Sequence, residues 1–329
     1  MDLTPSQLIQ HGRPFDSLFS EDKLEFYEQR DREIQWSHES NKRISVMETC
    51  GNKILIGLEN GEIQIFSTVD LQCQITLSHP ELKSKVTCLH CTCSEVIAGY
   101  EDCSACIWNI QSGDLTQRFC VGDRTSSTGY AKVIRLKGTR LVVATVDGVI
   151  GIWNYSNGSV KFVSEWRERR HLRRLEIAGD SIILMELWKG VSVYKFDGTP
   201  VHKICNPEAV KDVGIYGDYA ITGDKKCCRL LLWHIGTGTL IGERRGQGSQ
   251  IKCVSARDGH VLSVDKKASV VIWSTEAILE GRPAALMKIF DPSDSPQAEI
   301  QCCSLYSLGP NYFVRLDPNK SVIKVTDFL

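Results

Sequence analysis

Four cysteines in this chain have the spacing of metal ligands. Cys88 and Cys91 form one C-x2-C pair, Cys103 and Cys106 form a second, and Cys93 lies between the two pairs. Two such pairs are a common ligand pattern of structural zinc sites, because four thiolates can surround one Zn²⁺ ion as a tetrahedron. Whether the sulfur atoms can meet depends on the elements that carry them.

A set of basic residues suggests anion binding instead. The set comprises Arg43, Lys85, Lys132, Arg135, His171, Arg173, Arg174 and Lys211. Arginine and lysine pair well with carboxylates and phosphates, so an acidic or phosphorylated peptide is the ligand that this set favours. The alternative interpretation is that they are solvated loop residues, some of them paired with Glu165, Glu168 or Glu176.

The sequence contains none of the common catalytic motifs. It lacks the G-x-S-x-G turn of serine hydrolases, the phosphate-binding G-x-x-x-x-G-K-[ST] loop and the H-E-x-x-H helix of zinc proteases. Its histidines are scattered along the chain. We therefore predict that the protein is not an enzyme and that it uses no cofactor and no metal.

The elements that must position these residues repeat along the chain. Residues 141–158, LVVATVDGVIGIWNYSNG, predict two strands joined by an Asp-Gly turn, which is the strongest short-range hairpin signal. The aromatic or apolar residue near the end of the second strand recurs at intervals of 42, 45, 41, 39, 40 and 52 residues, at Phe66, Trp108, Trp153, Tyr194, Trp233, Trp273 and Val325. A period of about 40–45 residues with four short strands per unit indicates a β-propeller.

At these positions the chain resembles the WD-repeat family. Ile152-Trp153-Asn154 and Leu232-Trp233-His234 stand where that family has its Trp-Asp pair, and the resemblance extends from about Glu33 to Leu329. It implies an all-β fold, a seven-bladed WD-type β-propeller. It implies little about activity, because one fold can serve many functions.

The resemblance also implies structural roles for a second group of residues. In the family, a buried hydrogen-bond network joins a histidine, a serine or threonine, a turn aspartate and the tryptophan, and such a network satisfies buried polar groups. The corresponding residues here are Trp108, Trp153, Trp233, Trp273, Asp147, Asp224, Asp265, His38 and His79. The network is incomplete, since the fourth repeat has none of its polar members.

Two domains are predicted. Residues 1–32 form an N-terminal extension with a short helix, because Ser20-Glu21-Asp22 is an N-cap followed by KLEFYEQRD. Residues 33–329 form the propeller. Within it, Glu33–His38 alternates apolar and polar residues and is predicted to supply the outermost strand of the last blade. This N-terminal strand would close the ring and cover its open edges.

The repeat register argues against the zinc site. Cys88 falls on the innermost strand of the second blade and Cys106 on its third strand. Adjacent strands lie ~4.8 Å apart, so these two strands are ~10 Å apart, too far to share one ion with bonds of ~2.3 Å. We therefore expect the cysteines, fourteen in all, to be reduced and to serve as small buried side chains.

Charge and hydropathy limit the classes of partner. The formal net charge is −1 over 329 residues, so a partner held by broad electrostatic attraction, such as duplex nucleic acid, is not expected. No apolar run approaches the ~18–20 residues that span a bilayer, and residues 1–31 have no apolar signal-peptide centre. We expect a location in the cytoplasm, the nucleus or both, and no membrane partner.

The predicted function is that of a non-enzymatic scaffold, a monomeric ring that works within a complex. The innermost strands of a propeller all start at one mouth of its channel, so the basic set would gather there and recognise an acidic or phosphorylated partner peptide. A resemblance to F-box/WD-repeat proteins suggests an adaptor of a ubiquitin ligase, although residues 1–31 are too short for an F-box and lack its pattern. The alternatives are a structural subunit of a trafficking or RNA-processing complex and an enzyme built on the propeller.

Overall fold

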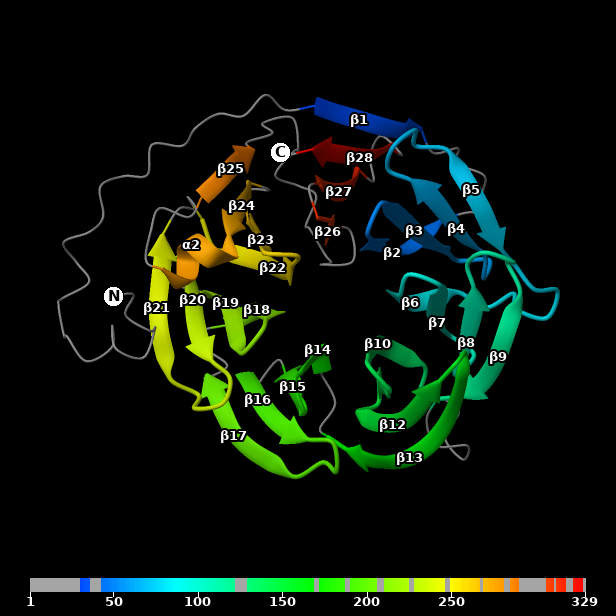
Figure 1. The fold of residues 1–329 in the computed structure, drawn as a ribbon, viewed down its shortest axis with the longest axis horizontal. Coiled ribbons are helices and arrows are strands. Elements are labelled where there is room, and N and C mark those ends of the chain that lie inside the picture. The colour runs from blue at the N-terminus through cyan, green and yellow to red at the C-terminus, as the bar shows by residue number, and fades with distance from the viewer. Residues whose placement is uncertain are drawn as a thin grey trace.

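The computed structural model describes residues 30–35, 43–121, 129–168, 172–186, 190–205, 210–224, 228–245, 249–266, 269–280, 285–289, 306–310, 312–317 and 322–327. In these residues the strands form seven four-stranded antiparallel sheets. Figure 1 shows them arranged as blades around a central channel. The predicted seven-bladed propeller is therefore confirmed.

Blades one to four follow one another along the chain. Blade one contains β2 (Ile44–Cys50), β3 (Lys53–Leu58), β4 (Ile63–Ser67) and β5 (Cys73–Leu77). Blade two contains β6 (Val86–Cys91), β7 (Glu95–Tyr100), β8 (Ser104–Asn109) and β9 (Leu115–Cys120). Blade three contains β10 (Ala131–Lys137), β11 (Arg140–Thr145), β12 (Val149–Ser156) and β13 (Ser159–Arg167). Blade four contains β14 (Leu172–Ala178), β15 (Ser181–Glu186), β16 (Gly190–Lys195) and β17 (Pro200–Cys205).

Blades five to seven complete the ring. Blade five contains β18 (Val210–Tyr216), β19 (Tyr219–Asp224), β20 (Arg229–His234) and β21 (Leu240–Arg245). Blade six contains β22 (Ile251–Arg257), β23 (His260–Asp265), β24 (Val270–Ser274) and β25 (Ala285–Ile289). Blade seven contains β26 (Tyr306–Leu308), β27 (Tyr312–Asp317), β28 (Val322–Asp327) and β1 (Arg30–Gln35).

The hairpin at Asp147-Gly148 shows why these residues form these strands. β11 and β12 pair in antiparallel register from Arg140↔Asn154 to Ala144↔Ile150. Gly148 has a φ of 90°, a left-handed conformation that glycine adopts at little cost. Five consecutive residues of each strand beside the turn are buried, because both faces of the blade pack against neighbouring blades.

Blade seven is closed by β1, which pairs with β28 from Arg30↔Asp327 to Gln35↔Val322. The Arg32 guanidinium donates to both carboxylate oxygens of Asp327, at 3.0 and 2.7 Å, and also to the Thr68 carbonyl of blade one. Closure by an N-terminal strand is therefore confirmed, and the two strands lie side by side in Figure 1.

The bounds of this strand differ from those predicted. It begins at Arg30 rather than at Glu33. Arg30 and Asp31, which the sequence placed at the end of a helix, pair with β28 instead, because this edge offers backbone partners along its whole length. Residues 1–29, with the rest of the predicted helix, and residues 36–38 lie outside the described residues.

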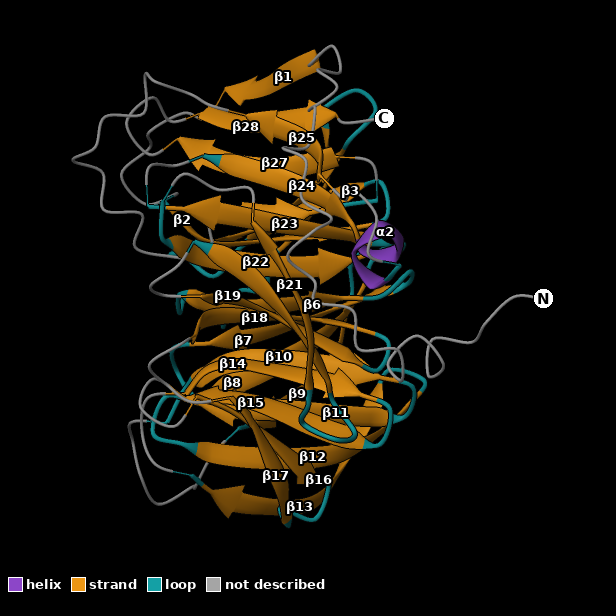
Figure 2. Cartoon of the chain, turned by 90° about the vertical axis from the view of Figure 1, so that its left-hand side faces the viewer, coloured by secondary structure: helices purple, strands orange, loops and turns teal. Residues whose placement is uncertain are grey.

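An insertion between the third and fourth strands of blade six carries helix α2 (Thr275–Leu279), whose N-cap is Ser274. Ala277 and Ile278 are buried, and Arg244 of β21 donates to the Ile278 carbonyl at 2.7 Å. The helix therefore packs against blade five. Figure 2 shows it at one face of the ring, on the right of that view.

The inner strands share a β-bulge near their start. In β2, β6, β10, β14 and β22 the register shifts between the first and the third residue, and in β18 it shifts between Val210 and Val213. A bulge re-aims the side chain of its extra residue. In blade one that residue is Ser45, which donates to the Val86 carbonyl of blade two at 2.7 Å, and in blade two Thr87 donates to the Ala131 carbonyl at 2.6 Å.

Candidate functional site

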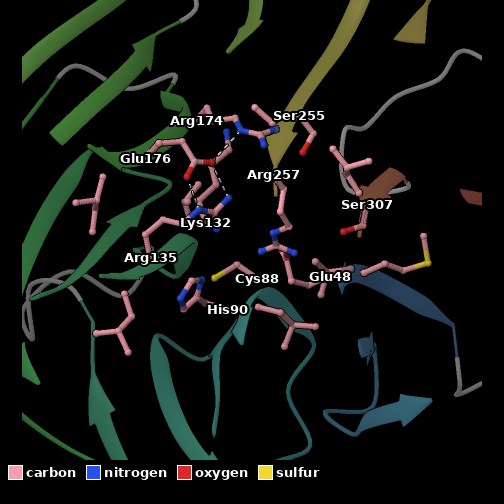
Figure 3. Close-up of a pocket in the computed structure, with 18 of the residues that line it drawn as sticks. Glu48, Cys88, His90, Lys132, Arg135, Arg174, Glu176, Ser255, Arg257 and Ser307 are labelled. Atoms are coloured by element: carbon pink, nitrogen blue, oxygen red, sulfur yellow. Dashed lines mark hydrogen bonds and ion pairs between the residues drawn. The ribbon is translucent and has the colours of Figure 1, made fainter. Parts of the chain in front are cut away.

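A cavity of about 310 Å³ occupies the channel at the centre of the ring. Its walls come from the inner strands β2, β6, β10, β14, β22 and β26. Six lining residues are basic, namely Lys132, Arg135, Lys137, Arg173, Arg174 and Arg257, whereas Glu48 and Glu176 are acidic. Figure 3 shows part of this lining.

The structure brings together four of the eight basic residues singled out in the sequence. Lys132, Arg135, Arg173 and Arg174 line the cavity. The exposed Arg43 and the half-buried Lys85 do not line it, and Lys85 forms an ion pair with Glu59 at 3.5 Å. His171 and the side chain of Lys211, the second residue of β18, lie outside the described part of the chain.

The expected equivalence of Arg43, Lys85 and Lys132 is wrong. The carbonyls of Arg43 and Lys85 accept from Glu59 and Glu101 at 2.9 Å, and in blade three the corresponding bond runs from Val146 to Tyr130. Tyr130 is therefore the counterpart of Arg43. The sequence analysis took Lys132, two residues further along, as the residue before the inner strand of blade three. It could not show where the β10 bulge lies.

Once the register is corrected, a different basic series appears at the second residue of the inner strands. Blades three to six all carry a cation there, and blades one and two carry a hydroxyl. The series is Ser45, Thr87, Lys132, Arg173, Lys211 and Lys252. Lys132 and Arg173 are exposed, and both line the cavity. Lys252 is a residue that the sequence analysis missed.

Deeper in the channel the charges are paired. Glu176 accepts two hydrogen bonds from Arg135, both at 3.0 Å, and one from Arg174 at 3.2 Å. Burial opposes ionisation of this carboxyl, but the two guanidinium groups outweigh burial and lower the pKa of Glu176 to about 2. Burial likewise disfavours the charge of Arg135, and Glu176 more than compensates, so the pKa of Arg135 is raised.

Asp212 extends this network to two further blades. Arg174 donates to Asp212 at 3.4 Å, and the same carboxylate accepts from the backbone N–H of Val213 and of Val254, at 3.0 and 2.9 Å. The chain of contacts thus joins blades three to six. Arg135 and Arg174 are therefore held in place by carboxylates of blades four and five.

Arg257 reaches the channel from the last position of β22. It forms an ion pair with Glu48 at 3.1 Å and donates to the carbonyl and hydroxyl oxygens of Thr49. Figure 3 shows Arg257 directed toward Glu48, on the side of the cavity opposite Arg135 and Glu176. This contact joins blade six to blade one.

Polar residues lie at the fifth position of five inner strands, and of these the sequence analysis proposed only Arg135 as a binding residue. They are Glu48, His90, Arg135, Glu176 and Ser255, and all of them line the cavity. Burial lowers the pKa of His90 to about 4, so His90 is neutral at neutral pH. A polar residue recurring at one position of otherwise apolar strands was the signal that could have revealed them.

The residues assigned to the family network lie at the blade interfaces. The Trp233 indole donates to Thr222 at 2.9 Å and the Trp273 indole donates to Ser263 at 2.7 Å. Asp224 pairs with Arg229 at 3.0 Å, Asp265 accepts from the backbone of Ser269, and Asp147 accepts from Thr145.

The remaining members of that set differ in their surroundings. Trp108 and Trp153 are buried in apolar clusters. His79 accepts from the backbone N–H of Glu81 at 3.3 Å, a contact within one turn. His38 lies outside the described residues.

The cysteine pairs are separated by the packing. Cys88 belongs to the apolar cluster between blades two and three, whereas Cys91 and Cys106 belong to the cluster between blades one and two. Within the described part of the chain, no group of three or more His, Cys, Asp or Glu side chains is arranged to hold a metal ion.

Comparison with known proteins agrees with this geometry. The family model of the WD40 repeated domain matches residues 24–162. The match in these residues and the seven blades show the fold of a WD40-type β-propeller. No curated protein sequence matches the chain. No helix among the described residues is both long and apolar enough to cross a membrane.

Several solved structures share the fold at low sequence identity. A chain of the mitotic checkpoint complex has a TM-score of 0.67 and 12% identity over 90% of each chain. The WD40 β-propeller domain of Doa1 has a TM-score of 0.65 and 12% identity, covering 89% of this chain and 95% of that one. The computationally designed Ika8 protein has a TM-score of 0.63 and 16% identity, covering 87% and 84%. These likenesses concern the fold alone.

Proposed function

We propose that this chain is a non-enzymatic scaffold that binds an acidic or phosphorylated segment of a protein partner at the channel mouth where the inner strands begin. WD40 propellers generally bind protein partners. The observation that carries the proposal is the position of Lys132 and Arg173, which are exposed at the same bulge of adjacent blades and line the cavity. Cations at such a mouth attract anionic groups and can pair with them.

The paired arginines have a different role in this proposal. Arg135 and Arg174 contact Glu176 and Asp212, so they keep the wall of the channel in place. Lys132 and Arg173 make the first contact with the ligand, and Lys211 and Lys252 extend the same series into blades five and six. Arg43 and Lys85 continue the basic surface outside the cavity.

The proposal is tested with a charge-reversal variant of the tagged full chain. Affinity purification followed by mass spectrometry compares the wild type with Lys132→Glu/Arg173→Glu. We expect recovery of the partner to fall roughly tenfold or more, because two attractive contacts become repulsive. The matched control is Lys161→Glu/Lys195→Glu, which reverses two exposed charges on β13 and β16. Unchanged recovery with the first variant would refute the proposal.

The class of partner follows from two further comparisons. Treating the lysate with a phosphatase removes a phosphorylated ligand and leaves an acidic one in place. Co-purification of ubiquitin-ligase subunits would support a role as a ligase adaptor, which is suggested by the F-box/WD-repeat resemblance. A large stoichiometric complex that is insensitive to charge reversal would instead favour a structural subunit. We place this activity in the cytoplasm or nucleus.

A further inference from the structure

Two thiols meet where the inner strands of blades one and two end. Cys50 is the last residue of β2 and Cys91 is the last residue of β6. The Thr92 carbonyl oxygen accepts from both thiols, at 3.5 Å from the Cys50 sulfur and 3.0 Å from the Cys91 sulfur. The two thiols therefore lie on the same carbonyl oxygen, at the ends of neighbouring inner strands.

The surroundings make the two thiols chemically unequal. The hydrogen bond from Cys91 lowers the pKa of Cys50 to about 7; partial burial opposes this shift, and the positive charge of Arg257 adds to it. The same contact, together with burial, raises the pKa of Cys91. At neutral pH Cys50 is therefore partly a thiolate, which is the nucleophilic form, and Cys91 keeps its proton.

The two thiols also differ in their exposure to solvent. Cys50 is half-buried, so a small oxidant can reach it, whereas Cys91 is only 7% exposed. A reactive thiolate beside a protected thiol is the usual arrangement of a pair that oxidises in two steps. The positive charges of Arg257 and Lys53 favour the thiolate of Cys50, whereas the Glu48 carboxylate opposes it.

We propose that Cys50 and Cys91 form a reversible, peroxide-sensitive disulfide that links blade one to blade two. The Cys50 thiolate attacks one oxygen of hydrogen peroxide, the O–O bond breaks, and the released hydroxide takes up a proton to become water. The Cys91 sulfur then attacks the Cys50 sulfenic acid, forms the S–S bond, and expels the sulfenic oxygen as a second water. Peroxide is reduced and the two thiols are oxidised. A dithiol such as dithiothreitol reverses the reaction by forming its own disulfide.

The link would fasten the ends of two inner strands that otherwise belong to separate sheets. In the reduced protein β2 and β6 are held together by the apolar cluster of blades one and two and by the Ser45 bond to the Val86 carbonyl. A disulfide adds a covalent constraint at the opposite end of the same strands. Unfolding of either blade is then opposed by the other.

The test oxidises the folded full chain with hydrogen peroxide and maps its disulfides by mass spectrometry without reduction. We expect peptides containing Cys50 and Cys91 to become linked, with the loss of two hydrogen atoms, and dithiothreitol to reverse the link. In Cys91→Ser the reaction should stop at a Cys50 sulfenic acid, which dimedone traps. The matched control is Cys93→Ser, which removes an exposed thiol two residues away and should leave the link intact.

Two further measurements keep the proposal falsifiable. Alkylation of Cys50 by iodoacetamide should have its midpoint near pH 7 in the wild type. The midpoint should shift upward in Cys91→Ala, which removes the donor at position 91. The exposed Cys73 in the same sample shows how fast the reagent reacts with an exposed thiol. Oxidation should raise the Tm of the wild type by several degrees and leave that of Cys50→Ser unchanged. A link from Cys50 to Cys93, or no intramolecular link in folded protein, would overturn the proposal.

Discussion

Glu176 is the residue on which the charge balance of the channel wall depends. It lies between two guanidinium groups, and its side chain is 19% exposed. A carboxylate that is taken out of water is stable only if other charges and hydrogen bonds replace its hydration. Arg135 and Arg174 supply this replacement, and the low pKa of Glu176 is the result.

This pairing predicts a pH-dependent contribution to stability. The pKa of Glu176 falls from 4.5 to about 2 on folding, so the carboxylate stabilises the fold above pH 4.5, and this contribution is lost as the pH falls toward 2. The shift corresponds to about 3 kcal/mol. Urea unfolding at pH 7 should show Glu176→Gln to be less stable by about this amount, with a smaller loss on acidification than the wild type.

The control for this experiment is Glu165→Gln, which neutralises an exposed carboxylate on β13. It should leave both the free energy of unfolding and its pH dependence unchanged. Equal pH profiles for the wild type and Glu176→Gln would show that the ion pair contributes no net stability.

Residue-level prediction from the sequence failed where the backbone departs from regular pairing. Lys132 and Arg173 were singled out and line the cavity. Arg43 and Lys85 were placed at the same level as Lys132, although they precede their strands and Lys132 lies within β10. A bulge shifts every later side chain to the other face of the strand. Neither composition nor periodicity marks its position, so which cations face the cavity could not be predicted.

At the scale of the elements, β1 is the strand that converts an open array of blades into a ring. It covers the edge of β28, and Arg32 joins it to both blade seven and blade one. Closed sheets avoid the pairing of exposed edges with other chains. The contacts of Arg32 with Asp327 and with the Thr68 carbonyl therefore link blade seven to blade one.

Replacing Arg32 should weaken this closure. Arg32→Ala removes the bidentate contact with Asp327 and the donor to the Thr68 carbonyl, so we expect a loss of about 1–2 kcal/mol in the free energy of unfolding. Lys161→Ala removes an exposed cation from the edge strand β13 and should change stability little. Chemical denaturation of both variants measures the difference; equal stability would mean that the backbone pairing of β1 alone closes the ring.

The elements themselves were largely predictable from the sequence. Asp-Gly and Asn-Gly turns between apolar segments predict the individual hairpins. The regular spacing of the tryptophans and their counterparts predicts the number of repeats. The start of β1 was predicted three residues too late, because the local helix signal of residues 23–31 competes with pairing to β28, a partner that is remote in sequence. Tertiary pairing overrides local propensity at such a position.

For the whole molecule, the short inner strand of blade seven is held by contacts with the blades on either side of it. β26 has three residues, whereas β2 and β22 have seven each. Arg257 bridges blade six to Glu48 and Thr49 of blade one, and Thr49 in turn hydrogen-bonds to Ser307 at 2.9 Å and donates to the Leu308 carbonyl at 2.7 Å. The short strand is thus held between two longer neighbours.

Removal of this bridge should loosen blade seven selectively. In Arg257→Ala we expect faster amide hydrogen exchange in residues 306–308 and 312–317, equivalent to a local loss of about 2 kcal/mol, because Glu48 loses its partner. Lys266→Ala, an exposed cation of the same blade, serves as the control. Uniform exchange across all blades in both variants would contradict a local role for Arg257.

The pairing of β1 with β28 sets the order in which this protein can be completed during synthesis. Arg32 and Asp327 are 295 residues apart. A ribosome adding about 5–20 residues per second needs on the order of 15–60 s to make that length. During this interval β1 has no partner while earlier blades can already form. The last sheet is therefore assembled only after translation has passed β28, and a nascent chain stalled before that point exposes two strand edges for a chaperone to cover.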